Sequence, residues 1–166
     1  MTFQIWISSA YSTVYRCGGW AFVRQGQGQL TGAAGGDRHT TAERTALIGL
    51  AAALKDLPDA KTAGIVSLLT TGPELTPFAG VLASVASAQP SAGPGDNLDL
   101  WAPIVAAAQG RLLRLSRAPL DPLSPTGFTT AWAELGSDKA KASGPFTAAI
   151  PKANLLKIKG LPEAGG

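Results

Sequence analysis

A single histidine, His39, limits the acid–base chemistry open to this chain. A Ser-His-Asp site or a histidine-bearing zinc site would have to be built on it, and Ser8 and Ser9 have no other identifiable base. His39 lies in an Arg-His-Thr-Thr segment before a predicted helix, which is typical of a surface or capping residue. We therefore do not expect nucleophilic or zinc-dependent catalysis.

Basic side chains at two places could contact phosphate groups. Arg38, His39 and Arg44 cluster at the entrance of the predicted helix. Three further arginines recur every three residues at positions 111, 114 and 117, but alternation along a strand places the middle one on the opposite face. We therefore take Arg38, His39 and Arg44 as the candidates for nucleic-acid binding, through phosphate and not through base edges.

Composition bounds the possible classes of protein. The chain has 166 residues, 45% hydrophobic residues, a formal net charge of +3 and a pI near 9.2. This length suits one α/β core, and the small basic excess permits a polyanionic ligand without requiring one. Cys17 is the only cysteine, so no internal disulfide is expected, which fits a reducing compartment. No apolar run approaches the roughly 20 residues of a membrane helix, so we expect a soluble, cytoplasmic protein without membrane contact.

The hydrophobic pattern predicts the elements in the order βββαβαβα. Strands are expected over residues 2–8, 18–24 and 29–32, with turn glycines between the second and third. Leu47, Leu50 and Leu54 mark one face of a helix that Thr40 or Thr41 caps and Pro58 ends. Residues 63–69 form a continuous apolar run, which predicts a central strand buried on both faces.

The second half of the chain is less regular. Pro73 and Glu74 suit the first turn of a short helix, and residues 83–95 are expected to form a flexible loop. Asp99 is expected to cap a helix that runs to about residue 110, before a strand over 111–117 and a last helix around 129–141. Residues 144–166 form an apolar C-terminal extension that we expect to pack on the domain of residues 1–143 or on a partner.

Three segments resemble the ribonuclease H family. Residues 18–23 (Gly-Gly-Trp-Ala-Phe-Val) are similar to its glycine-aromatic second strand, residues 38–44 to the segment that opens its first helix, and residues 97–101 to the start of its fourth helix. The resemblance covers roughly residues 1–142. It implies an α/β ribonuclease H-like fold, with a mixed five-stranded sheet flanked by helices.

The family's metal-binding acids are absent from the matching positions. The resemblance implies four carboxylates that hold two magnesium ions, and this chain carries Ser8, Ala46, Thr71 and Ala133 there. Two divalent ions about 4 Å apart repel each other unless anionic oxygens surround them. The family's lysine-rich protrusion and the histidine before the last helix are also missing.

Glu43 and Glu74 are the fallback candidates for a rearranged metal site, because each lies three residues from a lost acid, with Asp121 or Asp138 as additional ligands. Both glutamates also suit first helical turns, where a carboxylate is stabilised by the helix dipole. We therefore expect no catalytic residues, no metal and no cofactor.

We expect a catalytically inactive ribonuclease H-like protein retained for nucleic-acid binding or protein interaction. One alternative is an active ribonuclease H that cleaves the RNA strand of RNA–DNA hybrids with magnesium or manganese in a rearranged site. The other alternative is a homo-oligomeric protein-interaction module without a nucleic-acid role.

Overall fold

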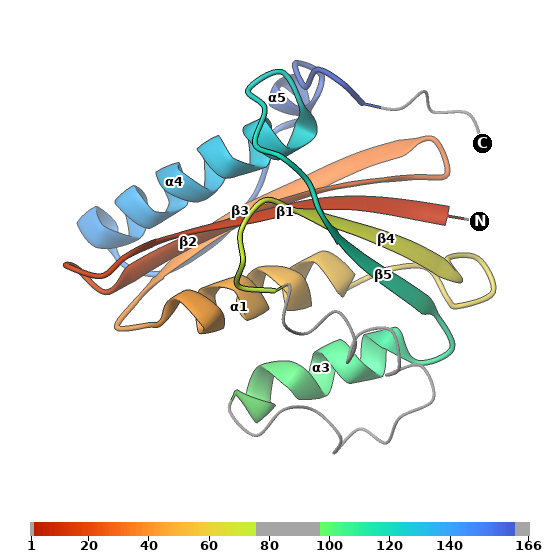
Figure 1. Ribbon diagram of the computed structural model, residues 1–166, viewed down its shortest axis with the longest axis horizontal. Helices are drawn as coiled ribbons and strands as arrows, with labels where there is room; N and C mark the ends of the chain where they lie inside the picture. The colour runs from red at the N-terminus through yellow and green to blue at the C-terminus, as the bar shows by residue number, and fades with distance from the viewer. Residues whose placement is uncertain (1, 76–96, 162–166) are drawn as a thin grey trace.

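A computed structural model describes residues 2–75 and 97–161 as one mixed sheet with helices on both faces (Figure 1). The strands are β1 (Thr2–Ser12), β2 (Cys17–Gly26), β3 (Gln29–Arg38), β4 (Ile65–Thr70), β5 (Leu112–Arg117) and β6 (Phe146–Ala149). The helices are α1 (Ala42–Leu54), α3 (Leu98–Ala108), α4 (Pro125–Ser143) and α5 (Lys152–Leu155). The predicted order βββαβαβα is confirmed, and β6 and α5 follow it.

The sheet combines an antiparallel hairpin unit with parallel crossovers. Its strand order is β5-β4-β1-β2-β3-β6, in which β1 pairs antiparallel with β2 and parallel with β4. Gln27 and Gly28 take positive φ values in the turn between β2 and β3, as a tight hairpin requires. The parallel arrangement places the end of β4 beside the middle of β1, where Thr70 pairs with Ile7.

The expectation of five strands is wrong by one, because the start of the C-terminal extension adds a sixth strand. Phe146 pairs with Gly36, and Ala149 with Ala33, along the outer edge of β3. Beyond β6, Ile150 and Leu155 are buried in the same hydrophobic cluster as Trp6. The segment is short, and its partner strand lies more than 100 residues earlier, so no local pattern announces the pairing.

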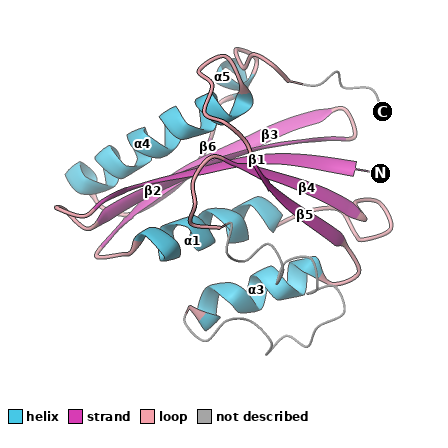
Figure 2. Cartoon of the chain, in the orientation of Figure 1, coloured by secondary structure: helices cyan, strands magenta, loops and turns pink. Residues whose placement is uncertain are grey.

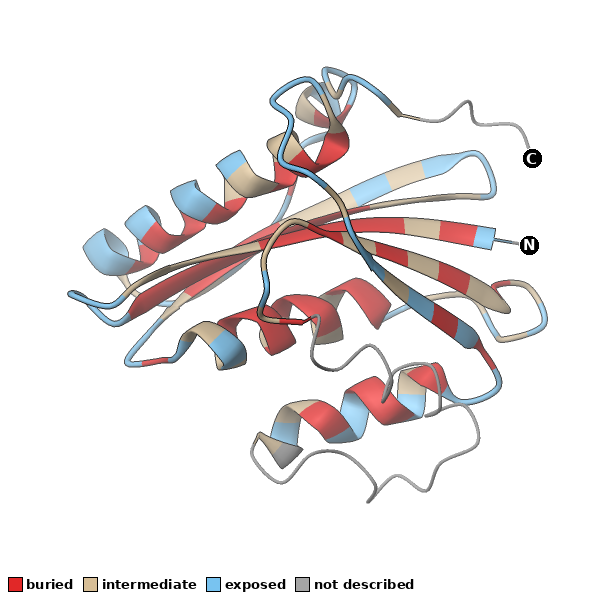
Figure 3. Cartoon of the chain, viewed as in Figure 1, coloured by how far each residue is buried: buried red, intermediate tan, exposed pale blue. Residues whose placement is uncertain are grey.

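The two faces of the sheet carry separate hydrophobic cores. Helices α1 and α3 cover one face and α4 covers the other (Figure 2). Phe3, Ile5 and Ile7 pack toward α1, while Trp6 packs with Ala133 of α4. Figure 3 shows the buried side of α1 and of α4 turned toward the sheet. Successive residues of β1 therefore face opposite helices, which fixes the side to which each polar residue points.

Strand β4 is central, as expected, but only one of its faces is fully buried. Val66, Leu68 and Thr70 are buried, whereas the residues between them are half-buried. The side chains of β4 toward the α1 face are covered by α1 and α3. On the opposite face α4 packs against β1, β2 and β3. The sequence of β4 is therefore apolar on both faces, although only the face toward α1 is fully buried.

The predicted cap residue is confirmed for one helix and wrong for another. The Thr41 hydroxyl accepts the backbone N–H of Arg44 at 3.1 Å, so Thr41 is the cap of α1. The cap of α3 is Asn97, and Asp99, the predicted cap, lies in the first turn of the helix. Residues 71–75 form bends, so no helix begins at Pro73 within the described residues. The flexible loop predicted over residues 83–95 lies outside them.

Arg111 has a structural role at the start of β5. Its side chain is only 9% exposed and donates to the carbonyls of Pro58 at 2.6 Å, Ala63 at 2.9 Å and Ala107 at 2.8 Å. Burial lowers the pKa of the guanidinium, with the nearby Asp59 opposing that change. The Arg111 side chain therefore connects α3, the segment after α1 and the residues before β4 through hydrogen bonds.

Replacing Arg111 with methionine is expected to lower the free energy of unfolding by about 2 kcal/mol or more, because buried carbonyls lose their donors. Urea denaturation of both proteins measures the loss. The matched control is Arg111→Lys, which keeps the charge but cannot reach three carbonyls with one planar group. We expect it to recover only part of the stability, and full recovery would contradict the role assigned to the guanidinium.

No helix in the described residues has both the length and the apolar character needed to cross a bilayer.

Candidate functional site

Four hydroxyl side chains converge where β1, the end of β4 and α4 meet. Ser8 Oγ lies 2.7 Å from Thr129 Oγ1, and Thr130 Oγ1 donates to Ser8 Oγ at 3.0 Å. Thr71 Oγ1 makes a longer contact of 3.5 Å with Thr130 Oγ1. We call Ser8, Thr71, Thr129 and Thr130 the hydroxyl cluster.

The hydroxyl cluster is organised as a chain of donors that ends on the backbone. Thr129 Oγ1 donates to the Thr126 carbonyl at 3.2 Å, so its proton is not free for Ser8. Ser8 must therefore donate to Thr129, while it accepts from Thr130. Each hydroxyl has one proton to give. The protons of these three residues are thus all used within the protein, and the cluster is electrically neutral.

The fold divides the four positions matched to the family's acids between the two faces of the sheet. Ser8 and Thr71 join the hydroxyl cluster through Thr130. Ala133 lies one turn further along α4 and packs with Ala21, the cross-strand neighbour of Ser8. Ala46 lies in the core between the sheet and α1. Thr129 and Thr130 were not singled out from the sequence, although they precede Ala133 by four and three residues on one helix.

The fallback candidates for a metal site, Glu43 and Glu74, are not part of the hydroxyl cluster. Glu43, in the first turn of α1, accepts a hydrogen bond from the Asn97 side-chain amide at 3.0 Å. Glu74 follows β4 and is half-buried in the bend that contains Gly72. Across residues 2–75 and 97–161, His, Cys, Asp and Glu side chains form no group of three or more that could hold a metal ion.

Two of the three candidate phosphate contacts make intramolecular hydrogen bonds. Arg44 donates to both carboxylate oxygens of Asp99, at 3.0 and 2.7 Å, and to the side-chain oxygen of Asn97 at 3.2 Å. Arg38 donates to the carbonyls of Ala140 at 2.7 Å and Lys141 at 2.5 Å, at the end of α4. His39 is exposed and has a positive φ of 52°.

The Arg44–Asp99 pair has a testable electrostatic signature. The hydrogen bond from Arg44 lowers the pKa of Asp99 below its ordinary value. The stabilisation from this pair is therefore complete above the ordinary carboxylate pKa of about 4 and is lost as the pH falls through the lowered value. We expect Arg44→Gln to raise the pKa of Asp99, measured by NMR titration of the carboxyl carbon. Arg44→Lys should raise it less, and an unchanged pKa in Arg44→Gln would show that the pair does not form in solution.

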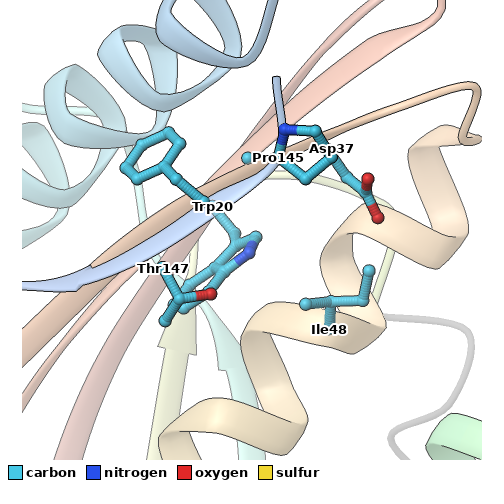
Figure 4. Close-up of a pocket in the computed structure, with 7 residues that line it drawn as sticks. Trp20, Asp37, Ile48, Pro145 and Thr147 are labelled. Atoms are coloured by element: carbon cyan, nitrogen blue, oxygen red, sulfur yellow. The ribbon is translucent and has the colours of Figure 1, made fainter. Parts of the chain in front are cut away.

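A separate pocket of about 280 Å³ lies between α1, β3 and the start of β6. Its lining includes Trp20, Asp37, Ile48, Pro145 and Thr147 (Figure 4). Among the described residues of this lining Asp37 is the one acid, and one of its carboxylate oxygens already accepts the backbone N–H of Arg38 at 2.9 Å. One carboxylate among apolar side chains does not make a divalent metal site.

Comparison with known proteins gives the fold. No protein-family model matches the chain, and no curated protein matches it. Solved structures of similar shape do exist, and with the strand order above they show a ribonuclease H-like fold. The predicted fold class is confirmed.

Two of these structures are ribonuclease H domains. One is the N-terminal RNase H domain of a Mycobacterium tuberculosis protein, determined as a fusion with maltose-binding protein. It is 15% identical, has a TM-score of 0.60, and the match covers 86% of this chain and 97% of that one. The other is LC9-RNase H1, described as a type 1 RNase H with the type 2 active-site motif. It is 16% identical, has a TM-score of 0.56, and the match covers 92% of this chain and 78% of that one.

Proposed function

We propose that this chain is a non-catalytic ribonuclease H-like protein that binds nucleic acid. The observation that carries the first half of the proposal is the hydroxyl cluster at Ser8. In the family that the chain resembles, the matching place holds carboxylates and two magnesium ions. Here the side chains are neutral and bonded to one another.

The hydroxyl cluster does not suit divalent metal ions. Magnesium is a hard cation that loses hydration water reluctantly, and two such ions repel each other strongly at catalytic spacing. A neutral hydroxyl supplies no charge to offset that repulsion. An ion at this place would also disrupt the Thr130-to-Ser8-to-Thr129 chain of hydrogen bonds. The residues do not fit a two-metal centre, so we assign no cofactor and no hydrolytic step.

The rearranged-site alternative has less support. It requires Glu43 and Glu74 to hold the ions. Glu43, at the start of α1, already accepts a hydrogen bond from the Asn97 side chain. Glu43 would replace the acid that is missing at Ala46. Ala46 is buried in the core on the α1 side of the sheet. Ser8, by contrast, points toward α4. A metal centred between these residues would need ligands from both sides of the sheet.

Nucleic-acid binding is supported by the fold and by the basic excess of the chain. The similar solved structures are named as RNase H domains, and the formal net charge of this chain is +3. Arg38, His39 and Arg44 remain our proposed phosphate contacts. Arg44 must exchange Asp99 for phosphate, so its contribution is expected to be smaller than that of a free arginine. Protein partners, self-association and a cytoplasmic location stay predictions.

The test combines a cleavage assay with a binding assay on one labelled RNA–DNA hybrid. We expect no cleavage with magnesium or manganese, and binding that weakens as salt rises. Asp99→Asn is a useful variant, because it removes the carboxylate that pairs with Arg44 and should tighten binding. Hybrid turnover that disappears in Glu43→Ala would establish the rearranged metal site. Salt-insensitive or absent binding to hybrid, duplex and single strands would remove the nucleic-acid role.

A further inference from the structure

We infer that single-stranded nucleic acid binds at the tip of the β1–β2 hairpin, with a base stacked on Tyr15 and phosphates held by side chains at the end of α4. This inference rests on the proposed function and assigns it a site outside Arg44 and the hydroxyl cluster. We call Tyr15, Arg16, Arg38 and Lys141 the hairpin patch. The hairpin tip and the end of α4 lie at the same end of the molecule (Figure 1).

Tyr15 is an exposed aromatic ring that the protein holds in place. It keeps 56% of its surface exposed, and the Lys141 ammonium lies 3.4 Å from the ring centroid. The backbone around the ring is also fixed, because the Ser12 hydroxyl accepts the Tyr15 N–H and the Tyr15 carbonyl accepts from Cys17 Sγ. The residue stays more than half exposed with a lysine over one face of its ring, so aromatic surface remains open to a ligand. That is a platform on which a base can stack.

Arg38 changes the electrostatics of the adjoining helix end. The last carbonyls of a helix carry partial negative charge and would repel a phosphate. Arg38 donates to the carbonyls of Ala140 and Lys141, two of these groups. In the pairing of β2 with β3, Arg38 lies opposite Cys17, so its guanidinium lies beside the base of the hairpin. The end of α4 is thereby made suitable for an anion.

A further basic side chain follows Tyr15 directly in the chain, since Arg16 is exposed at the end of the hairpin turn. The carboxylates nearest in the chain to the residues of the hairpin patch are Asp37 and Asp138. Asp37 accepts the Arg38 N–H and lines the pocket beside Ile48. The three basic residues of the hairpin patch thus outnumber the two acids.

These features favour a single strand over a duplex. In a duplex the faces of the bases are stacked on each other, so a protruding tyrosine could meet only sugars and phosphates. A single strand offers unstacked bases to the ring and flexible phosphates to the basic side chains. Val14, which is also exposed at the tip, adds apolar surface beside the ring. An acidic peptide would use the charges of the hairpin patch but would gain little from a flat exposed ring.

The experiment is fluorescence anisotropy with a labelled oligothymidine, measured across a salt series. We expect Tyr15→Ala to weaken binding about 10-fold, because stacking of one base contributes on the order of 1 to 3 kcal/mol. Tyr15→Phe should bind like the wild type. Lys141→Gln should weaken binding and reduce the slope of log K against log salt by about 0.7. The matched control is Lys61→Gln, an exposed lysine before β4, at the opposite end of β1 from the hairpin.

The outcomes separate the inference from the proposed function. If the wild type binds oligothymidine but Tyr15→Ala and Lys141→Gln bind equally well with unchanged salt slopes, the hairpin patch is not the site, and the proposed function survives. If the wild type binds no nucleic acid at low salt, both fail. Competition by polyglutamate as strong as that by unlabelled oligothymidine would also overturn the inference, in favour of an acidic peptide. Circular dichroism melts confirm that each variant is folded.

Discussion

Replacing Ser8 with aspartate is expected to lower the free energy of unfolding by about 3 kcal/mol at neutral pH, because burial without a cationic partner raises a carboxyl pKa by about two units. Ser8 is only 2% exposed, and its described partners are hydroxyl groups. Thr130 can donate to the new carboxylate, but the proton of Thr129 is committed to the Thr126 carbonyl. Urea denaturation at several pH values measures the effect.

The pH dependence and the response to magnesium make this prediction specific. A raised carboxyl pKa leaves the variant close to wild-type stability below pH 4, and the loss grows as the pH rises toward the raised value. Ser8→Asn is the matched control, since it has the same shape without the charge and should show no such pH dependence. Magnesium should not restore stability to the aspartate variant. Restoration by millimolar magnesium would mean that other ligands for the ion are already in place.

Replacing Gly19 with alanine is expected to destabilise the protein by about 3 kcal/mol or more, since overpacking against rigid backbone forces the elements apart. A methyl group at Gly19 would collide with the Ala133 carbonyl and with the Ser137 backbone nitrogen of α4. A methyl group at Gly36 of β3 would likewise collide with the Gly136 carbonyl. Helix α4 therefore lies on a surface of glycines, and this close approach places Thr129 and Thr130 beside Ser8.

The control for this prediction is Gly28→Asn in the turn between β2 and β3. Gly28 has a φ of 73°, which asparagine tolerates, and a side chain there meets open space. Thermal melts should show little change for Gly28→Asn and a large decrease for Gly19→Ala. If Gly19→Ala melts near the wild-type temperature, α4 lies further from β2 than described.

Elements with a strong repeating pattern could be predicted from the sequence. The spacing of Leu47, Leu50 and Leu54 gave α1, and all three are buried in the core beneath it. The alternation of the first strands and their turn glycines gave the antiparallel unit. These signals are local, because each comes from how one element packs against a single layer.

Features that depend on distant pairing could not be predicted in this way. Strand β6 exists because β3 offers an open edge, and nothing within Phe146–Ala149 carries that information. Asp99 has the right chemistry for a cap, but Asn97 takes that place while Asp99 pairs with Arg44 of another helix. Arg111 looked like one of three similar arginines, and only the fold shows that it bonds three carbonyls.

The candidate site was predicted in part. The resemblance pointed to Ser8 and Thr71, and both belong to the hydroxyl cluster. It also pointed to Ala133, whereas the α4 side chains that bond to Ser8 are Thr129 and Thr130. A helical residue shares its face with those three and four positions away, so two threonines at those distances were an available signal. Their partners, however, come from the other end of the chain.

The most direct test of the absent metal centre is a manganese titration followed by NMR. Manganese is paramagnetic and broadens the amide signals of residues near it. We predict that the signals of Ser8, Thr71 and Thr130 keep the same relative intensity as those of Lys61 and Lys157 up to millimolar manganese. Selective, saturable broadening of the hydroxyl-cluster signals would show that the site holds divalent ions, and would contradict the account.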